Sequence, residues 1–384
     1  MDKVVIVMPA WNEAKNIEKM VGTLTKEVFP DIKGVDVELL VVDNNSTDGT
    51  TEIVEKAAKT NSKVHIIQQG SKSGLGWAYV AGINHAIKKL NADAVMEMDA
   101  DGQHPPRFVK PMIEAYLDGA DYVVGSRYVD GGSVPEEWAF TRKFVSYFGN
   151  LYIRLVWLNF KIHDVTTGFR LTRVKGVLEK IKLESLMELK RFAYKMDLFY
   201  RTLKLSKKTV EVPLEFRPRT EEKSKFNFKE MIASYKVATY LGIMDKIKII
   251  KFGIVGFAGF LVNFAFIRIF RGIGLAEVLT WLFATELAIA NNYIFNNIWT
   301  FKAEKISGVK AHINKFFQFN LTSAGALIIQ SILGPLGVRI FGAEYDYLVL
   351  AVIVLFIVFP YNYIMANVVI WKTWKLPKIF SRKK

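Results

Sequence analysis

The sequence contains no cysteine among its 384 residues. Disulfide bonds, thiolate nucleophiles and zinc sites with cysteine ligands are therefore excluded. The N-terminus also lacks the features of a secretory leader, because the apolar run at residues 4–8 is too short and no small-residue cleavage site follows it. We therefore expect the N-terminal domain to stay on the cytoplasmic side of any membrane.

Acidic residues are scarce relative to basic ones. The chain has 52 Lys and Arg against 37 Asp and Glu, a formal net charge of +15. Such a surface suits anionic lipid headgroups, phosphorylated substrates or nucleic acid. Nucleic acid is the weaker interpretation, because no nucleic-acid-binding module is recognisable and the basic residues cluster beside apolar segments. We expect no nucleic-acid partner.

Long hydrophobic runs are absent from roughly the first 245 residues and frequent after them. Four apolar stretches occupy residues 249–269, 278–299, 317–341 and 348–371. Each reaches the roughly 20 residues that an α-helix needs to cross a bilayer. We therefore expect an integral protein of the cell membrane, with an all-α C-terminal domain of four transmembrane helices.

The basic residues predict the orientation of these stretches. Lysines crowd the loop between the second and third stretches and the C-terminal tail, whereas the loop between the third and fourth carries Glu344 and Asp346. By the positive-inside rule, both termini lie in the cytoplasm. The predicted domains are a cytoplasmic domain at 1–225, a linker helix at the membrane surface at 226–248, and a transmembrane domain with a basic tail at 249–384.

The first domain reads as an alternation of strands and helices. Apolar strands are predicted at 4–8, 37–42, 64–68, 94–98 and 122–125, with helical patterns between them. This order is typical of a mostly parallel, doubly wound α/β domain. Ligands bind beyond the carboxyl ends of the strands in such a sheet, and the polar residues of this domain concentrate there.

Asp99 and Asp101 directly follow the fourth predicted strand, with Gln103 close behind. Two carboxylates at a strand exit can converge on one divalent cation, and Mg²⁺ or Mn²⁺ prefers oxygen ligands and also binds substrate phosphates. Asp101 and Gln103 are predicted as direct ligands, with Asp99 acting on a ribose or through water. The alternative is an ordinary surface turn rich in Asp and Gly.

Two more loops place polar groups at the same edge. Asp43 leaves the second strand and can accept hydrogen bonds from a base or ribose, while Glu13 leaves the first. Ordinary capping of the following helix is the alternative for the Asp43 loop. Residues 137–160 mix aromatic and basic side chains, which suits a helix at the membrane–water interface. A core helix with one wet face is the other interpretation.

Seven segments, in this order, carry a family resemblance: PAWNE at 9–13, VVDNNSTDGT at 41–50, SGLGWAYVAGI at 73–83, MDADGQHPP at 98–106, VGSRY at 124–128, HDVTTGFRLTR at 163–173 and EVPLEFRPRTEEKSK at 211–225. With them, residues 3–240 resemble family 2 glycosyltransferases, in particular the dolichyl-phosphate mannose synthase-like branch. The resemblance implies a Rossmann-like GT-A fold for this α/β domain.

The resemblance also implies a role for each matching residue. Those framing the nucleotide-sugar would be Pro9, Asn12, Glu13, Asp43, Asp99 and Arg127. Those serving Mg²⁺ or Mn²⁺ would be Asp99, Asp101 and Gln103. Those binding the lipid phosphate would be Arg142, Ser146, Arg219, Ser224 and Lys225. Asp99, Asp101 and Arg127 would carry the catalysis, with Arg127 facing the transferring phosphates.

Some positions depart from the family pattern: Trp11 replaces Tyr, Asn44 replaces Asp, Thr167 replaces Ser and Glu222 replaces Gly. Asn44 leaves the identity of the base open. Residues 249–371 resemble the four-helix domain of lipid-linked glucosylation systems, through KFGIVGFAGFLVNF at 251–264, the pair Asn291-Asn292 and the sequence WTF at 299–301.

The implied reaction moves one hexose, foremost mannose from GDP-mannose, onto dolichyl or polyprenyl phosphate with inversion. A phosphate monoester is largely a dianion at pH 7, so the acceptor needs cations to position it more than it needs a strong base. Two alternatives stay open. One is a UDP-glucose-dependent polyprenyl-phosphate glucosyltransferase. The other is a transporter of a lipid-linked sugar, in which Glu286, inside a predicted membrane segment, would take part.

Overall fold

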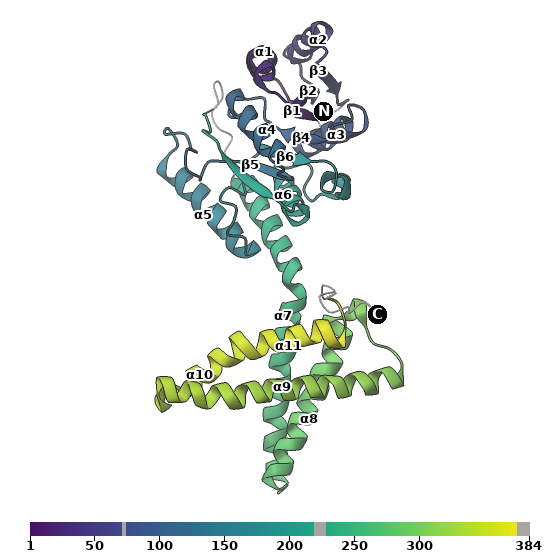
Figure 1. Ribbon diagram of the computed structural model, residues 1–384, viewed down its shortest axis with the longest axis vertical. Coiled ribbons are helices and arrows are strands. Elements are labelled where there is room, and N and C mark those ends of the chain that lie inside the picture. Colours follow the sequence, from purple (N-terminus) through teal and green to yellow (C-terminus); the bar gives the residue numbers. More distant parts are fainter. Residues whose placement is uncertain (71–73, 219–227, 375–384) are drawn as a thin grey trace. The chain divides into compact units, whose positions relative to one another are not determined.

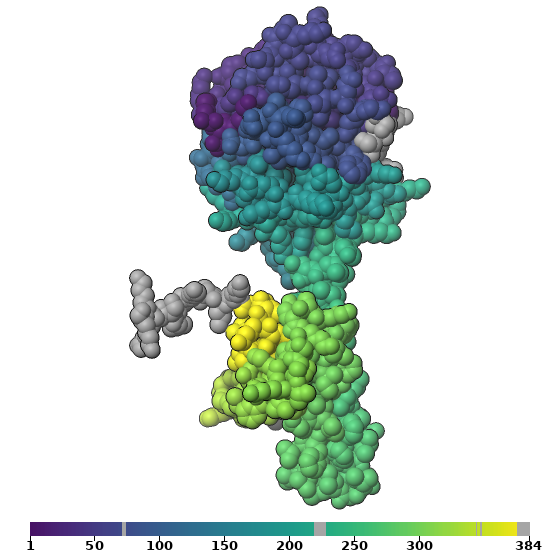
Figure 2. Space-filling view, turned by 90° about the vertical axis from the view of Figure 1, so that its right-hand side faces the viewer, coloured from purple at the N-terminus to yellow at the C-terminus, as the bar shows by residue number. Residues whose placement is uncertain are grey.

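The computed structural model describes residues 1–70, 74–218 and 228–374 (Figure 1). The chain divides into two compact units, Met1–Met244 and Asp245–Lys384. The first unit is a GT-A-like α/β domain and the second is helical. Figure 2 shows that the early residues of the first unit, in purple and blue, and its later residues, in teal, form one continuous surface.

A seven-stranded sheet lies at the centre of the first unit. Its strands are β1 (Asp2–Ala10), β2 (Val35–Asp43), β3 (Val64–Gln68), β4 (Ala94–Glu97), β5 (Tyr122–Ser126), β6 (Arg170–Arg173) and β7 (Thr209–Pro213). They are arranged in the order β3-β2-β1-β4-β6-β5-β7. The five predicted strands are confirmed, with boundaries that shift by up to two residues, and β6 and β7 complete the sheet.

One strand reverses direction within this parallel sheet. β6 runs antiparallel to β4 and β5, whereas the other neighbouring pairs are parallel. The loop that precedes β6 therefore lies at the edge where β1, β2, β4 and β5 end. This geometry brings residues 163–169 to the same place as the loops that carry the predicted nucleotide and metal residues.

Helices cover both faces of the sheet because its strands are apolar on both sides. On one face α1 (Ala14–Thr23), α2 (Thr50–Thr60) and α4 (Val109–Leu117) bury a core with the side chains of Val4, Ile6 and Met8. On the other face α3 (Leu75–Lys88) packs against Val5 and Val7, together with part of α6 (Tyr194–Leu205). Helix α3 lies so close to the sheet that a side chain at Gly82 would overlap Val7.

A long helix, α5 (Phe140–Trp157), lies in the connection between β5 and β6. It packs against the first part of α7 (Phe228–Gly272), where the indole of Trp157 donates a hydrogen bond to the carbonyl of Ala238 at 2.9 Å. Elsewhere on its surface α5 exposes the aromatic rings of Phe140, Phe144, Tyr147 and Phe148, while the partly exposed Tyr152 contacts α7. The predicted aromatic helix at 137–160 is thus present, and the rings that it exposes are unusual for a water-facing surface.

The second unit contains the C-terminal part of α7 followed by α8 (Glu277–Phe295), α9 (Val309–Phe341), α10 (Asp346–Ile353) and α11 (Phe359–Met365). Helix α7 contacts α8 through Phe270 and Phe283, and α9 packs along α10 and α11. Among the described residues, three helices are long and apolar enough to cross a membrane: Phe228–Gly272, Val309–Phe341 and Leu348–Ile370. The predicted second crossing at 278–299 corresponds to α8, whose apolar surface is interrupted by Glu286.

Candidate functional site

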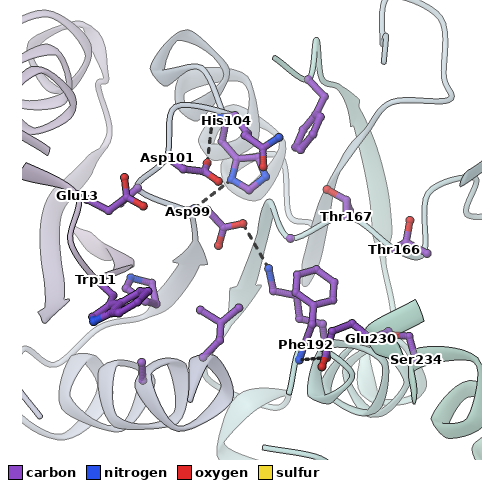
Figure 3. Close-up of a pocket in the computed structure, with 18 of the residues that line it drawn as sticks. Trp11, Glu13, Asp99, Asp101, His104, Thr166, Thr167, Phe192, Glu230 and Ser234 are labelled. Carbon is purple, nitrogen blue, oxygen red and sulfur yellow. Dashed lines mark hydrogen bonds and ion pairs between the residues drawn. The ribbon is translucent and has the colours of Figure 1, made fainter. Parts of the chain in front are cut away.

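A pocket of about 1090 Å³ opens at the edge where the parallel strands end (Figure 3). It brings together most of the residues that the sequence singled out: Pro9, Asn12, Glu13, Asp99, Asp101, Gln103, Arg127, Arg142 and Ser146. Arg219, Ser224 and Lys225 lie outside the described residues. Apart from Asp43, the described residues predicted to bind donor and acceptor therefore share one cavity in the first unit.

The loops after β1 and β2 are fastened to each other by hydrogen bonds. The backbone N–H groups of residues 12–14 donate to the side chains of Ser46, Thr50 and Asp48 at 2.9–3.0 Å. In return, the side-chain oxygen of Asn12 accepts from the N–H of Thr47 at 2.9 Å. Asn12 itself has a positive φ of 55°, a conformation that Asn tolerates better than most residues. This fastening presents Trp11 and Glu13 to the pocket.

Asp43 lies beneath these loops and does not line the pocket. It is buried, and its Oδ2 accepts hydrogen bonds from the N–H of Ser46 at 3.2 Å and the hydroxyl of Thr51 at 3.0 Å. Its Oδ1 is buried without a hydrogen-bond partner among the described residues. In this structure Asp43 supports the nucleotide loop from beneath, and its predicted contact with a base or ribose stays a prediction.

Asp99 is held from two sides at the centre of the pocket. The hydroxyl of Tyr79 donates to its Oδ1 at 2.7 Å, and the ammonium of Lys195 lies 3.4 Å from its Oδ2. Burial raises the pKa of Asp99, but the charge of Lys195 and the hydrogen bonds from Tyr79 and Lys195 lower it to about 2. Asp99 is therefore an ionised carboxylate with a fixed orientation.

His104 also contacts Asp99 at the centre of the pocket. Its Nδ1 accepts a hydrogen bond from the N–H of Asp99 at 3.1 Å, which places the ring proton on Nε2. Burial lowers the pKa of His104 more than the carboxylates of Asp99 and Asp101 raise it. The ring stacks on Phe169. His104 thus stays neutral and supports the backbone of Asp99.

Asp101 and Gln103 form the outer part of the same loop. The Oδ1 of Asp101 accepts the N–H of Gln103 at 3.1 Å, and the side-chain amide of Gln103 donates to the carbonyl of Arg217 at 3.3 Å. The donation by nitrogen leaves the Oε1 of Gln103 as the end of the amide that can bind a cation. Within the described ranges no three His, Cys, Asp or Glu side chains form a metal-binding group. Carboxylate and amide oxygens completed by substrate phosphates are nevertheless a donor set that suits Mg²⁺ or Mn²⁺.

Arg127 is buried in an ion pair. Its Nε and Nη2 donate to the two carboxylate oxygens of Asp164 at 2.6 and 2.8 Å, and Nη2 also donates to Thr166 at 2.7 Å. Burial lowers the pKa of Arg127, but the Asp164 carboxylate raises it above its usual value. The charge of Arg127 is therefore largely offset by Asp164, a partner that the sequence analysis did not assign.

The side of the pocket that carries the predicted acceptor residues Arg142 and Ser146 is built by α5. The guanidinium of Arg142 lies 3.8 Å from the centre of the Trp138 ring, which fixes it by a cation–π contact. The hydroxyl of Ser146 accepts a hydrogen bond from Tyr128 at 2.5 Å. These two residues are one helical turn apart, and both line the pocket. A cation and a hydroxyl on one helix face are groups that bind phosphate.

Lys195 and Gly168 are functional candidates that the sequence analysis missed. Lys195 lies in a helix that no apolar periodicity had indicated, and a lysine is rarely fully buried. Gly168 belongs to a segment already singled out, yet its role depends on a neighbour 27 positions away in the chain. A signal for either could have come only from knowing which strands pair.

Comparison with known proteins gives two family matches. Residues 5–179 match "Glycosyl transferase family 2", and residues 251–371 match "GtrA/DPMS, transmembrane domain". The chain is 32% identical over 379 residues to a dolichol-phosphate mannosyltransferase of Pyrococcus furiosus, covering 97% of this chain and 100% of that one.

Two bacterial proteins match the N-terminal part. A polyprenol monophosphomannose synthase of Mycolicibacterium smegmatis is 36% identical over 242 residues, which cover 62% of this chain and 86% of that one. An undecaprenyl-phosphate mannosyltransferase of Micrococcus luteus is 35% identical over 225 residues, which cover 59% of this chain and 88% of that one.

Proposed function

Because the chain belongs to the family 2 glycosyltransferases of the dolichyl-phosphate mannose synthase-like branch and has their GtrA/DPMS transmembrane domain, we propose that it transfers mannose from GDP-mannose to a polyprenyl phosphate. The chain is thus a membrane-bound glycosyltransferase, and the specific donor and acceptor are the proposal. The observation that carries it is the shared pocket, in which the Asp99–Asp101 loop faces Arg142 and Ser146 on α5. The names of all three relatives specify mannosyl transfer to a polyprenyl-type lipid.

The donor half of the pocket would hold the nucleotide-sugar. Pro9, Asn12 and Glu13 line it. Asp43, buried beneath their loops, would support this half through its hydrogen bonds with Ser46 and Thr51. Asp99, Asp101 and Gln103 would hold Mg²⁺ or Mn²⁺, which supplies positive charge to the leaving nucleoside diphosphate. Arg127 would add a polarised N–H donor near the same phosphates.

The acceptor half would hold the lipid phosphate. Arg142 and Ser146 would bind the phosphate oxygens, joined by Arg219, Ser224 and Lys225 from the segment that follows β7. The phosphate arrives as a dianion and attacks the sugar without a strong base, and direct displacement inverts the anomeric centre. The aromatic rings that α5 exposes would lie in the headgroup layer, where the polyprenyl chain can stay in the bilayer.

The second unit would anchor the enzyme through four membrane crossings. One of them would be α8, which is not among the three helices that are long and apolar enough by themselves. The catalytic unit and both termini would lie in the cytoplasm, with domain limits at 1–225, 226–248 and 249–384. The helix α7 covers both the proposed linker and the first crossing, since it runs unbroken from Phe228 to Gly272.

A donor screen tests this proposal. Purified full-length protein in detergent, with polyprenyl phosphate and Mn²⁺ or Mg²⁺, is offered radiolabelled GDP-mannose and UDP-glucose in turn, and label is counted in the organic phase. Asp101→Ala should abolish transfer, whereas Asp118→Ala, which removes an exposed carboxylate outside the pocket, should retain it.

Each outcome has a distinct meaning. Metal-dependent transfer from GDP-mannose supports the proposal. Transfer only from UDP-glucose replaces the donor and keeps the reaction, in line with Asn44 at the nucleotide loop. Absence of transfer from either donor contradicts the proposal and favours transport of a lipid-linked sugar by the second unit.

A further inference from the structure

Lys195 is a fully buried lysine at the edge of the pocket. Its side chain has 0% exposure, and its ammonium contacts the Oδ2 of Asp99 at 3.4 Å. The ring of Phe192 covers the ammonium, with its centre 4.3 Å away. A charged ammonium in such a position requires a compensating anion, because desolvating an unpaired charge is costly. Asp99 supplies that anion.

The surrounding backbone is shaped around this contact. A side chain on Gly168 would overlap the Lys195 ammonium and would come within 3.3 Å of the Oδ2 of Asp99. Gly168 has no positive φ that would call for glycine. Glycine at position 168 is therefore explained by the lack of room for a Cβ atom beside the Lys195–Asp99 pair.

The other buried cation of the pocket is already balanced. Arg127 is paired with Asp164 through its Nε and Nη2. At the proposed metal loop, Lys195 offsets the negative charge of Asp99. The charge presented to a divalent ion is thus set by a residue that does not belong to the loop.

We propose that Lys195 is a positioning residue of the donor site, which holds the Asp99 carboxylate against the Tyr79 hydroxyl and offsets the charge of Asp99. The divalent ion is then bound weakly enough to leave with the nucleoside diphosphate. This inference rests on the proposed function. Without the charge of Lys195, the Asp99 carboxylate would hold the cation more tightly after transfer, since a metal ion gains affinity with each net negative charge in its site. Lys195 therefore tunes release more than binding of the donor.

The test measures Mn²⁺ affinity by electron paramagnetic resonance on the full-length protein with GDP and UDP present. Lys195→Met preserves the length of the side chain and removes its charge. We expect it to bind Mn²⁺ about tenfold more tightly, the order of magnitude for removing one unit charge beside a divalent ion. Transfer should become slower while the KM for the lipid phosphate stays within about twofold, because Lys195 lies on the donor side.

Two further variants complete the test. Gly168→Ala displaces the ammonium without removing it and should shift Mn²⁺ affinity in the same direction by a smaller factor. Lys204→Met makes the same change at an exposed position of α6 and should leave Mn²⁺ affinity unchanged.

Unchanged or weaker Mn²⁺ binding by Lys195→Met would overturn the inference, because a lysine that only fills space would give that result. Failure of the wild-type protein to bind Mn²⁺ at all would also overturn it. Lack of sugar transfer alongside the expected change in Mn²⁺ affinity would contradict the proposed function alone, since the metal measurement requires neither sugar nor lipid.

Discussion

Replacing Asp164 by Asn should destabilise the first unit strongly. The Asp164 side chain is 0% exposed and that of Arg127 is 8% exposed. The substitution keeps the shape of the side chain but leaves the guanidinium buried without a counter-charge. Breaking a buried ion pair in this way costs about 3–5 kcal/mol. At about 2–4 °C for each kcal/mol in a domain of this size, the melting temperature should fall by about 10 °C.

The assay is thermal unfolding of the full-length protein in detergent, followed by intrinsic fluorescence. Arg127→Met should give a similar loss, because it leaves the Asp164 carboxylate unpaired. The double variant Arg127→Met, Asp164→Leu removes both charges and should recover most of the lost melting temperature. Sugar transfer should stay absent in the double variant if Arg127 also contacts the donor phosphates.

This pattern separates the two roles of Arg127. A melting temperature of Asp164→Asn within about 2 °C of wild type would refute the reasoning, because it would mean that the guanidinium does not depend on this carboxylate. Losses of Arg127→Met and Asp164→Leu alone that add up in the double variant would refute it as well, since the energetic coupling of a pair appears as non-additivity.

Three further predictions concern other parts of the first unit. Phe144→Ser removes an exposed ring of α5 and should raise the KM for polyprenyl phosphate about tenfold at an unchanged melting temperature, since roughly half of the 1.5–3 kcal/mol of burying a Phe in lipid is lost; an unchanged KM would mean that these rings do not meet the membrane. Gly149→Ala should lower the melting temperature because its Cβ would overlap the Tyr235 hydroxyl, whereas Gly22→Ala on α1, with open space around it, should not; equal effects would contradict the close packing of α5 and α7. Although burial raises the pKa of Asp48, hydrogen bonds from Thr50 and Ala14 lower it. Its contribution to stability is therefore present above the unfolded pKa of about 3.9 and lost as the pH falls through the folded value. Asp48→Asn should be less stable than wild type at pH 6, by less than about 1 kcal/mol for so exposed a group, and the difference should shrink as the pH falls below about 3.9; a difference of constant size over that range would exclude the charge as its cause.

The sequence predicted the parallel strands because each is a continuous apolar run, which local composition reveals. It did not predict β6, since the sequence RLTR has two charged residues and its place between β4 and β5 depends on pairing with residues far away in the chain. The Asp99–Asp101 loop could be placed at the sheet edge because it directly follows an apolar run that is recognisable as a strand.

The partners of the site residues were beyond local patterns. Asp164 is 37 positions from Arg127, and Lys195 is 96 positions from Asp99. These pairs exist because the antiparallel β6 and the start of α6 return to the sheet edge, which no periodicity in the chain encodes. The sequence therefore predicted a phosphate contact for Arg127 but did not reveal that Asp164 holds the Arg127 side chain.

The connection that contains α5 begins and ends at adjacent points of the sheet. Val123 of β5 pairs with Leu171 of β6, and the N–H of Gly125 donates to the carbonyl of Phe169 at 2.9 Å. The Arg127–Asp164 pair fastens the base of the loop between them. The segment between Arg127 and Asp164 therefore begins and ends on a fixed base. Replacing residues 128–163 by the corresponding segment of a relative should change the contacts proposed for the acceptor, while Arg127, Asp164 and Gly168 stay in place.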